Sequence, residues 1–176
     1  MLEGKLVNLR VVEKEDLPLL LDWFNNPEFS GRYNPLNSQQ SKAEIEKKHD
    51  NMGFEKKWFI IERKDGSKIG FIDQFAVRDH WGIGFALVPS ERGKGYCTEA
   101  VQLMVDYLFL SKDIAKILTL THIENIASQK VLEKTGFKRE GLLLKELFMW
   151  GKWVDCYRYS ILREDWKEPK ILTKTS

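Results

Sequence analysis

The sequence predicts one α/β domain in which strands and helices alternate around a mixed sheet. Along the 176 residues, strand-like stretches of alternating apolar and polar residues follow one another in turn with stretches of helical periodicity. No repeat, linker or low-complexity segment divides them. A chain of about 150 residues buries roughly 70% of its unfolded surface, so this length supports a full core. We therefore expect a single domain over residues 1–176, with its core at about 4–166 and a short polar tail at 167–176.

The elements of the N-terminal half follow from periodicity and from turn and cap residues. Strands are expected at residues 6–12, 58–61, 68–77 and 81–88, and helices from Asp16 to about residue 25 and from Ser41 to about residue 52. Asp16 is expected to cap the first helix, and Ser41 with Glu44 forms a capping-box pair at the start of the second. Asp65 and Gly66 predict a hairpin turn between the second and third strands.

The C-terminal half continues the alternation and ends in a long hairpin. The expected elements are a helix around residues 101–108, a strand at 116–122, a helix at 128–134, and strands at 138–150 and 153–162. Gly136 is expected to stop the second helix, because glycine readily adopts the left-handed conformation of a helix C-terminus. Gly151 and Lys152 are expected to form the two-residue turn of the closing hairpin.

The composition is typical of a globular protein and excludes several classes of function. Lys and Arg number 28 against 26 Asp and Glu, a net charge of +2, so no basic surface for nucleic acid is indicated. No apolar run approaches the ~18 residues of a membrane span, and the first residues do not resemble a secretory signal. We expect a cytoplasmic protein that binds neither nucleic acid nor membrane. The scattered cysteines and histidines predict neither a disulfide nor a metal site.

The most informative segment is residues 89–100, which lies between an apolar strand and an amphipathic helix. It contains Gly93 and Gly95 beside the cations Arg92 and Lys94. A helix start has unpaired N–H groups and a partial positive charge, and glycines let a phosphate approach the backbone closely. The segment therefore predicts an anion site. It lacks the spacing of a P-loop, and Thr98 replaces the third glycine of a dinucleotide motif, so a nucleotide-dependent oxidoreductase is a weaker alternative.

A second segment, residues 125–137, follows the next predicted strand. The carboxyl ends of adjacent parallel strands meet at one edge of a sheet, where α/β proteins form a ligand crevice. Asn125 and Ser128 are therefore expected to lie near the anion site. The same two residues are also typical of an Asx turn and a helix cap, which would give them a structural role only.

Together the two segments resemble the GNAT superfamily of acyl-CoA-dependent N-acetyltransferases. The family has Q/R-x-x-G-x-G/A at a helix start and, after the next strand, N-x-x-S with a V-L-E-K-x-G-F ending. The similarity covers residues 4–166, and residues 6–10, 22–27 and 160–166 resemble the RimJ/RimL-type branch. It implies a mostly antiparallel sheet with a central, splayed parallel strand pair, acetyl-CoA as cosubstrate without a metal, and an amine as acceptor. A homodimer, common in this family, is left open.

The resemblance also implies the residues that bind the cofactor and act on it. The backbone of the loop from Arg92 to Thr98, the phosphate loop, would hold the pyrophosphate of coenzyme A. The end of the preceding strand would pair with the pantetheine arm, and Ser128 would protonate the leaving thiolate. The implied cofactor-binding residues are Leu87, Val88, Arg92, Gly93, Lys94, Gly95, Tyr96, Cys97, Thr98, Asn125 and Ser128.

The general base is not evident, because Gly82 occupies the position at which many members of the family have glutamate. Asp73 is an expected substitute, since a turn at residues 78–80 would place it opposite residue 85, and Asp155 is a second one. Each is also typical of a structural acid bonded to backbone. Cys97 allows a covalent alternative, because a helix start lowers the pKa of a thiol, although the matched position needs only a small side chain.

The missing glutamate suggests the class of acceptor. At pH 7, forming the neutral amine costs about 1 kcal/mol of free energy for an α-amine of pKa ~7.8. For an amine of pKa ~10.4 the cost is about 4.6 kcal/mol. A weak base therefore favours a protein or peptide N-terminal α-amine, or a small amine of low pKa, as the acceptor. A polyamine or another small amine is one alternative, and a catalytically weak module that senses acyl-CoA is another.

Overall fold

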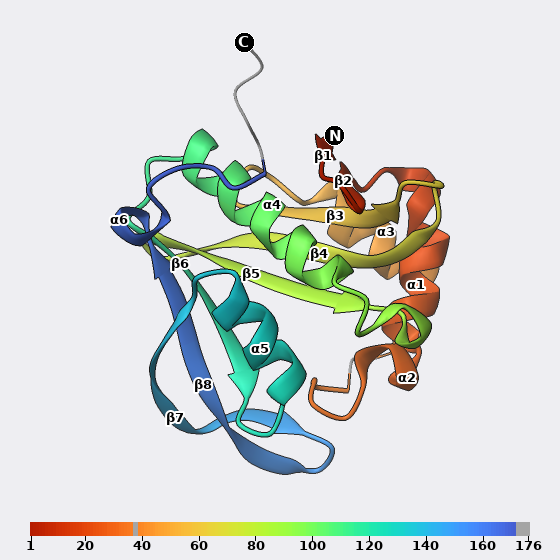
Figure 1. Cartoon of the computed structure of the whole chain (residues 1–176). Coiled ribbons are helices and arrows are strands. Elements are labelled where there is room, and N and C mark those ends of the chain that lie inside the picture. The colour runs from red at the N-terminus through yellow and green to blue at the C-terminus, as the bar shows by residue number, and fades with distance from the viewer. Residues whose placement is uncertain (37–38, 172–176) are drawn as a thin grey trace.

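The computed structural model describes residues 1–36 and 39–171, which contain an eight-stranded mixed sheet. The strands are β1 (Leu2–Glu3), β2 (Val7–Val11), β3 (Lys56–Arg63), β4 (Lys68–Val77), β5 (His80–Leu87), β6 (Lys116–His122), β7 (Lys138–Met149) and β8 (Lys152–Leu162). Their spatial order is β1-β2-β3-β4-β5-β6-β8-β7, and β5 and β6 form the parallel pair (Figure 1). The predicted α/β class and mixed, mostly antiparallel sheet are confirmed.

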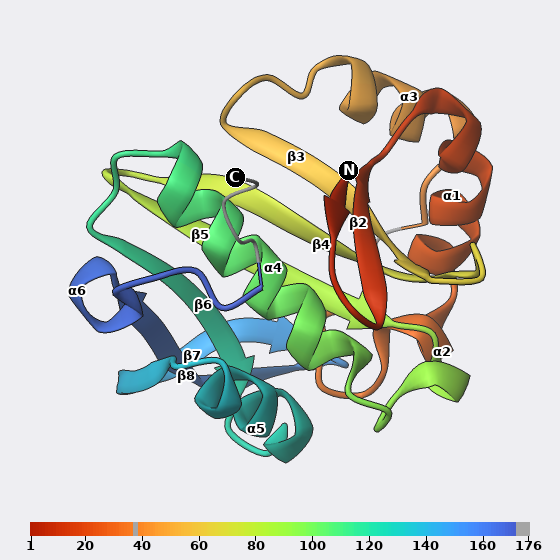
Figure 2. The same ribbon diagram turned by 45° about the horizontal axis from the view of Figure 1, so that its top comes forward.

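Helices cover both faces of this sheet. They are α1 (Leu17–Asn25), α2 (Pro27–Ser30), α3 (Lys42–Asp50), α4 (Tyr96–Ser111), α5 (Ile126–Lys134) and α6 (Arg163–Trp166). In Figure 2, α4 and α5 lie on one face of the sheet and α1 and α3 on the other. Phe59 and Ile61 pack in one core with α4, whereas Trp58 and Ile60 pack in a second core with α1, α2 and α3. Side chains alternate along a strand, so burial on both faces explains why residues 58–61 are continuously apolar.

The parallel pair diverges soon after it begins. Trp81 pairs with Ile117 and Gly82 with Leu118, and no further pairing joins the two strands in the described part of the chain. At the point of divergence the Thr119 hydroxyl donates to the carbonyl of Ile83 at 2.8 Å. The predicted splayed pair is therefore present, and its open end lies toward the N-termini of α4 and α5 (Figure 1).

The predicted helices are present, but α4 is longer than the expected 101–108 and α5 begins at Ile126 rather than at residue 128. Ser41 and Glu44 form the expected capping box of α3. Asp16, however, does not cap α1 with its side chain. Its carboxylate pairs instead with Arg10 at 2.8 Å and Lys68 at 2.7 Å. Burial by itself would raise the pKa of Asp16, but the bonds from Arg10, the Glu13 amide and Lys68 hold that pKa well below its ordinary value.

Two predicted turns lie one residue away from their observed positions. Val77 pairs with His80, so the β4–β5 turn contains only residues 78 and 79, and Asp73 lies opposite residue 84 rather than 85. In the closing hairpin the turn residues are Trp150 and Gly151, with φ values of 50° and 82°. Two positive φ values are typical of the type I′ turn, which matches the twist of antiparallel strands and which the glycine-first prediction missed.

Candidate active site

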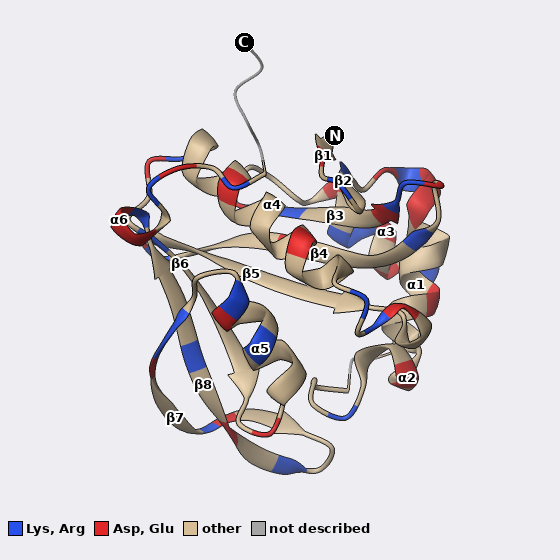
Figure 3. Cartoon of the chain, in the orientation of Figure 1, with Lys and Arg blue, Asp and Glu red and all other residues tan. Residues whose placement is uncertain are grey.

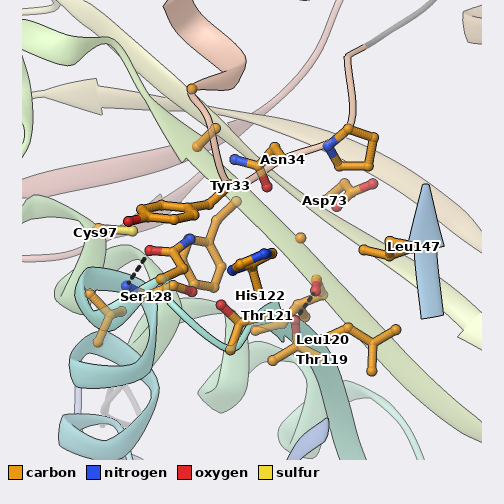
Figure 4. Close-up of a pocket in the computed structure, with 18 of the residues that line it drawn as sticks. Tyr33, Asn34, Asp73, Cys97, Thr119, Leu120, Thr121, His122, Ser128 and Leu147 are labelled. Carbon is orange, nitrogen blue, oxygen red and sulfur yellow. Dashed lines mark hydrogen bonds between the residues drawn. The ribbon is translucent and has the colours of Figure 1, made fainter. Parts of the chain in front are cut away.

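The divergence of β5 and β6 opens a cleft of about 1620 Å3. The loop before α4, the start of α5, the segment after α2 and the β7–β8 hairpin line this cleft. Trp150 in the hairpin turn donates from Nε1 to the carbonyl of Asn34 at 3.2 Å, which joins the hairpin to the segment after α2. In the view of Figure 4, Cys97 and Ser128 lie at one end of the cleft, Asp73 and Leu147 lie at the other, and His122 lies between them.

Unpaired amides make the loop before α4 a candidate anion site. Gly93 and Gly95 have φ values of 77° and 85°, a conformation that other residues adopt only with strain. Within the described residues, the backbone N–H groups of residues 93–98 donate to no protein acceptor, and the first helical bond runs from Glu99 to the Gly95 carbonyl at 3.2 Å. These amides converge at the positive end of a sixteen-residue helix, which suits a diphosphate.

The two loop cations have different roles. Arg92 donates from Nη2 to the Phe29 carbonyl at 2.8 Å and from Nε to the Leu87 carbonyl at 3.1 Å, so its side chain ties α2 to the end of β5. Lys94 pairs with Glu91 at 3.1 Å and is half exposed. Figure 3 shows this mixture of cationic and acidic residues on the loop that precedes α4. The backbone amides of the loop, unlike the Arg92 guanidinium, are therefore free to bind an anion.

The edge of β5 offers its backbone to the cleft at alternate residues. The Val88 N–H donates to the Ile69 carbonyl at 2.9 Å, so Val88 faces β4. Since backbone direction alternates along a strand, Phe85 and Leu87 turn toward the gap, where the Leu87 carbonyl already accepts the Arg92 bond. Phe85 is thus the residue best placed to pair with an extended ligand. The sequence pattern did not single it out, because only the register with β4 fixes which residues face the gap.

Asn125 and Ser128 are brought together at the start of α5. The Asn125 side-chain oxygen accepts from the Ser128 backbone N–H at 3.1 Å, which makes Asn125 the N-cap of the helix (Figure 4). The Ser128 hydroxyl has no partner among the described residues and lines the cleft. The structural role predicted for Asn125 is present, and it places Ser128 beside the open end of β5.

Asp73 faces the cleft from β4. An ideal Cβ at Gly84 would lie 2.6 Å from the Asp73 carboxylate oxygen, so this carboxylate occupies space that only a glycine leaves free. Burial raises the pKa of Asp73 to about 6, while the charge of Lys56 and the Gly84 amide act in the opposite direction. A carboxyl group with this pKa can accept and return a proton near neutral pH.

Asp155, the second predicted acid, has a different place. Its carboxylate accepts from the Lys145 backbone N–H at 2.8 Å, at the irregular pairing of β7 with β8. It is not among the residues that line the cleft. Gly82 in turn lies under the ring of Phe75, since an ideal Cβ there would lie 2.4 Å from a ring carbon. The space of the usual glutamate is filled by Phe75, and of these two aspartates only Asp73 lines the cleft.

Cys97 is not poised as a nucleophile. Burial raises the pKa of its thiol to about 12, although the charge of Arg92 lowers it. The predicted lowering at a helix start is therefore wrong in sign, because desolvation outweighs the helix terminus. A thiol that stays protonated at neutral pH does not support a covalent intermediate.

Two aromatic residues of the cleft were not among the predicted site residues. His122, at the end of β6, and Tyr33, after α2, lie with ring centroids 5.3 Å apart. A lone histidine outside any motif does not by itself indicate a functional site. The signal that could have found His122 is its position at the end of a strand, shortly before Asn125. Only the fold brings Tyr33 over it, from a segment 89 residues earlier in the chain.

The splayed parallel pair and the free amides at its open end fit the acyl-CoA site that the resemblance to acetyltransferases implies. The family model described as an acetyltransferase (GNAT) domain matches residues 7–138, and the chain belongs to this GNAT acetyltransferase family. It is an acetyl-CoA-dependent N-acetyltransferase, as predicted. No helix in the described residues is long and apolar enough to cross a membrane.

Individual relatives refine this picture. The N-acetyltransferase YnaD of Bacillus subtilis is 33% identical over 131 residues, which cover 73% of this chain and 75% of YnaD. The spermidine N(1)-acetyltransferase of Escherichia coli K12 is 28% identical over 166 residues, covering 91% of this chain and 88% of the relative. The RimJ/RimL-type branch, the homodimer and the cytoplasmic location stay predictions.

The fold itself is shared with a solved enzyme. The spermidine N-acetyltransferase of Vibrio cholerae, crystallised with CoA and spermine, superimposes with a TM-score of 0.80 at 24% identity. The match covers 92% of this chain and 98% of that one. The predicted GNAT-type fold is confirmed.

Proposed function

We propose that the protein transfers the acetyl group of acetyl-CoA directly to a primary amine of a small polyamine, with Asp73 as the general base. The observation that carries this proposal is the Asp73 carboxylate, which lies in the cleft at Gly84 and has a pKa of about 6. It supplies the base that Gly82 lacks. An amine of ordinary high pKa is therefore an acceptable substrate, which removes the main reason to restrict the acceptor to α-amines.

The cleft contains carboxylates that an acceptor with more than one ammonium group can use. Its acidic residues form no ion pair with a described residue; they are Asp73, Asp79, Glu124 and Glu146. Cations line the cleft as well: Lys116 is paired with Glu140 at 3.0 Å and Arg92 is bonded to backbone carbonyls, whereas Arg32, Arg78 and Arg158 form no ion pair among the described residues. One of these carboxylates can pair with a second ammonium of a polyamine, which a monoamine lacks. Spermidine acetyltransferases among the relatives support the same class of acceptor.

The cofactor residues are proposed from the same geometry. The amides of residues 93–98 would hold the diphosphate, with Lys94 as an exposed charge, and Phe85 and Leu87 would border the pantetheine arm. Val88 and Arg92, whose polar groups are bonded within the protein, would shape this end of the cleft. Leu87, Cys97, Asn125 and Ser128 line it as well.

The reaction then needs two proton movements. The amine nitrogen bonds to the thioester carbon, its proton passes to Asp73, and the carbon–sulfur bond breaks as the carbonyl re-forms. The sulfur gains a proton from the Ser128 hydroxyl, which faces the cleft without a protein partner. Ser128 then regains a proton from solvent water, and Asp73 releases the proton of the amine to solvent. No covalent enzyme intermediate is involved, consistent with the protonated thiol of Cys97.

Thiol release from acetyl-CoA tests the proposal. The panel contains spermidine, spermine, a monoamine of matched length, and peptides that present either a free N-terminus or only a lysine side chain. We expect kcat/KM for the polyamines to exceed that for every peptide at least tenfold. A higher kcat/KM on peptides with a free N-terminus would contradict the polyamine and support an α-amine as the acceptor, as the glycine at position 82 suggested. Binding of CoA by calorimetry with no release on any amine would establish the sensing module instead.

A further inference from the structure

His122 holds its imidazole in the cleft by a single bond to the backbone. Its Nδ1 atom accepts from the N–H of Glu124 at 2.9 Å, just after the end of β6. Its Nε2 atom has no hydrogen-bond partner among the described residues. Because Nε2 is absent from the buried side-chain atoms that lack a partner, it is accessible from the cleft. The residue lines the cleft, so this outer nitrogen is open to a ligand there (Figure 4).

The bond from Glu124 fixes the tautomer of the ring. A backbone amide always carries its hydrogen, so Nδ1 must present a lone pair to it. The neutral imidazole then carries its own hydrogen on Nε2. Taking up a further proton would occur at Nδ1 and would break the Glu124 bond. The ring is therefore arranged to donate a hydrogen bond into the cleft and not to remove a proton from an amine.

The surroundings hold the ring in this orientation. Tyr33 packs against it, with an angle of 33° between the ring planes, and the Tyr33 hydroxyl accepts a hydrogen bond from Arg32. Glu124 is the nearest acid along the chain and contacts the ring through its backbone only. Phe85 turns its N–H toward the same gap from β5, because Val88 fixes the alternation of that strand. Donors from the two diverging strands thus both border the cleft.

We propose that His122 is a catalytic residue whose Nε2–H donates to the acyl oxygen as the thioester carbonyl becomes a tetrahedral oxyanion. The inference rests on the proposed amine acetylation. When the amine nitrogen bonds to the carbonyl carbon, the C=O electron pair moves to oxygen, where His122 and the Phe85 N–H stabilise it. When the carbon–sulfur bond breaks, the pair returns. His122 keeps its proton throughout, while Asp73 receives the proton of the amine.

Three variants separate this role from a structural one. His122→Asn keeps an acceptor for the Glu124 N–H but has no donor at the outer position, so the fold is retained. We expect its kcat to fall about 10²- to 10³-fold, with a melting temperature near that of the parent. His122→Gln extends an amide toward the Nε2 position and should recover part of kcat. It should keep the acidic limb of the pH profile, which is the loss of activity as pH falls through the pKa of Asp73. His122→Ala should lose both activity and stability.

A binding experiment tests the donor independently of turnover. In ¹⁵N-resolved NMR spectra of the full chain, we expect Nε2 of His122 to be protonated and Nδ1 not. Acetonyl-CoA, a ketone that keeps the acyl oxygen, should shift the Nε2–H resonance, whereas CoA should not. A proton on Nδ1, an equal shift with both ligands, or an unchanged kcat in His122→Asn would overturn the proposal. Loss of the acidic limb in His122→Gln would show that His122 is a base. The NMR result stands even where no amine is acetylated.

Discussion

Asp73 lies directly opposite Gly84 across the β4–β5 pair, and its carboxylate oxygen occupies the space where a Cβ at Gly84 would lie, 2.6 Å away. The glycine therefore makes room for the acid at the edge of the cleft. Because β5 leaves β6 just beyond Gly82, the carboxylate is placed where the sheet opens. The proposed base thus depends on a residue pair that spans two strands and on the splay beside it.

Removing the charge of Asp73 tests its role in catalysis. Asp73→Asn keeps the size of the side chain but cannot accept a proton, so kcat/KM for the best amine should fall about 10²- to 10⁴-fold. The parent enzyme should lose activity as pH falls through about 6, the pKa of Asp73, and the variant should not show this limb. Asp155→Asn is the matched control, because Asp155 lies outside the cleft. An equal loss in both variants would count against Asp73 as the base.

Asp73→Asn should also raise the free energy of unfolding above pH 6. The pKa of Asp73 is raised from 3.8 to about 6 by burial, so the unfolded chain ionises this group first as pH rises. Folding free energy is therefore lost between about pH 4 and pH 6, up to about 3 kcal/mol. Asp73→Asn should unfold at a higher urea concentration than the parent at pH 8, with the difference vanishing near pH 4. A lower midpoint at pH 8 would contradict the raised pKa.

Restoring the family glutamate at residue 82 should fail. A side chain there meets the ring of Phe75 at 2.4 Å, so Gly82→Glu should cost about 1–3 kcal/mol of stability and give no gain in kcat. Denaturant midpoints and turnover are measured together. Combining Gly82→Ala with Phe75→Ala should destabilise less than the sum of the single changes, because the clash disappears. Additive losses would show that the two residues do not compete for space.

The phosphate loop is tested by two glycines with nearly the same backbone. Gly95 has a φ of 85° and Gly66, in the β3–β4 turn, a φ of 84°. Substitution by alanine should strain each site by about 1–2 kcal/mol. Only Gly95→Ala should weaken CoA binding, at least tenfold by calorimetry, because its amides face the proposed diphosphate. A tenfold loss in Gly66→Ala as well would indicate a global effect.

Cys97 should be dispensable for chemistry. Burial raises the pKa of its thiol to about 12, so the thiolate is scarce at neutral pH. We expect Cys97→Ala to retain kcat within about threefold, and iodoacetamide to leave Cys97 unmodified at pH 7.5 in the folded protein. Mass spectrometry after quenching detects labelling, and an acetylated Cys97 peptide would revive the covalent alternative.

Local sequence patterns were sufficient for most of the fold. The capping box of Ser41 and Glu44, the 68–77 strand and the 116–122 strand were placed correctly, since each depends on neighbouring residues. The two errors of turn position have one origin. A turn shifted by one residue exchanges every pair of the hairpin, and its position depends on the twist of the strands as much as on the turn residues.

The sequence by itself determined the family, the glycine loop before α4 and the position of Ser128 near the start of α5, because glycines, helix starts and spacing are local features that one chain displays directly. Tertiary structure alone decided that Asp73 meets Gly84, that Arg92 bonds to carbonyls of α2 and β5, and that Tyr33 covers His122. These relationships join residues far apart in the chain. Their strength depends on desolvation and on pairing register, which exist only once the sheet has closed around the cleft.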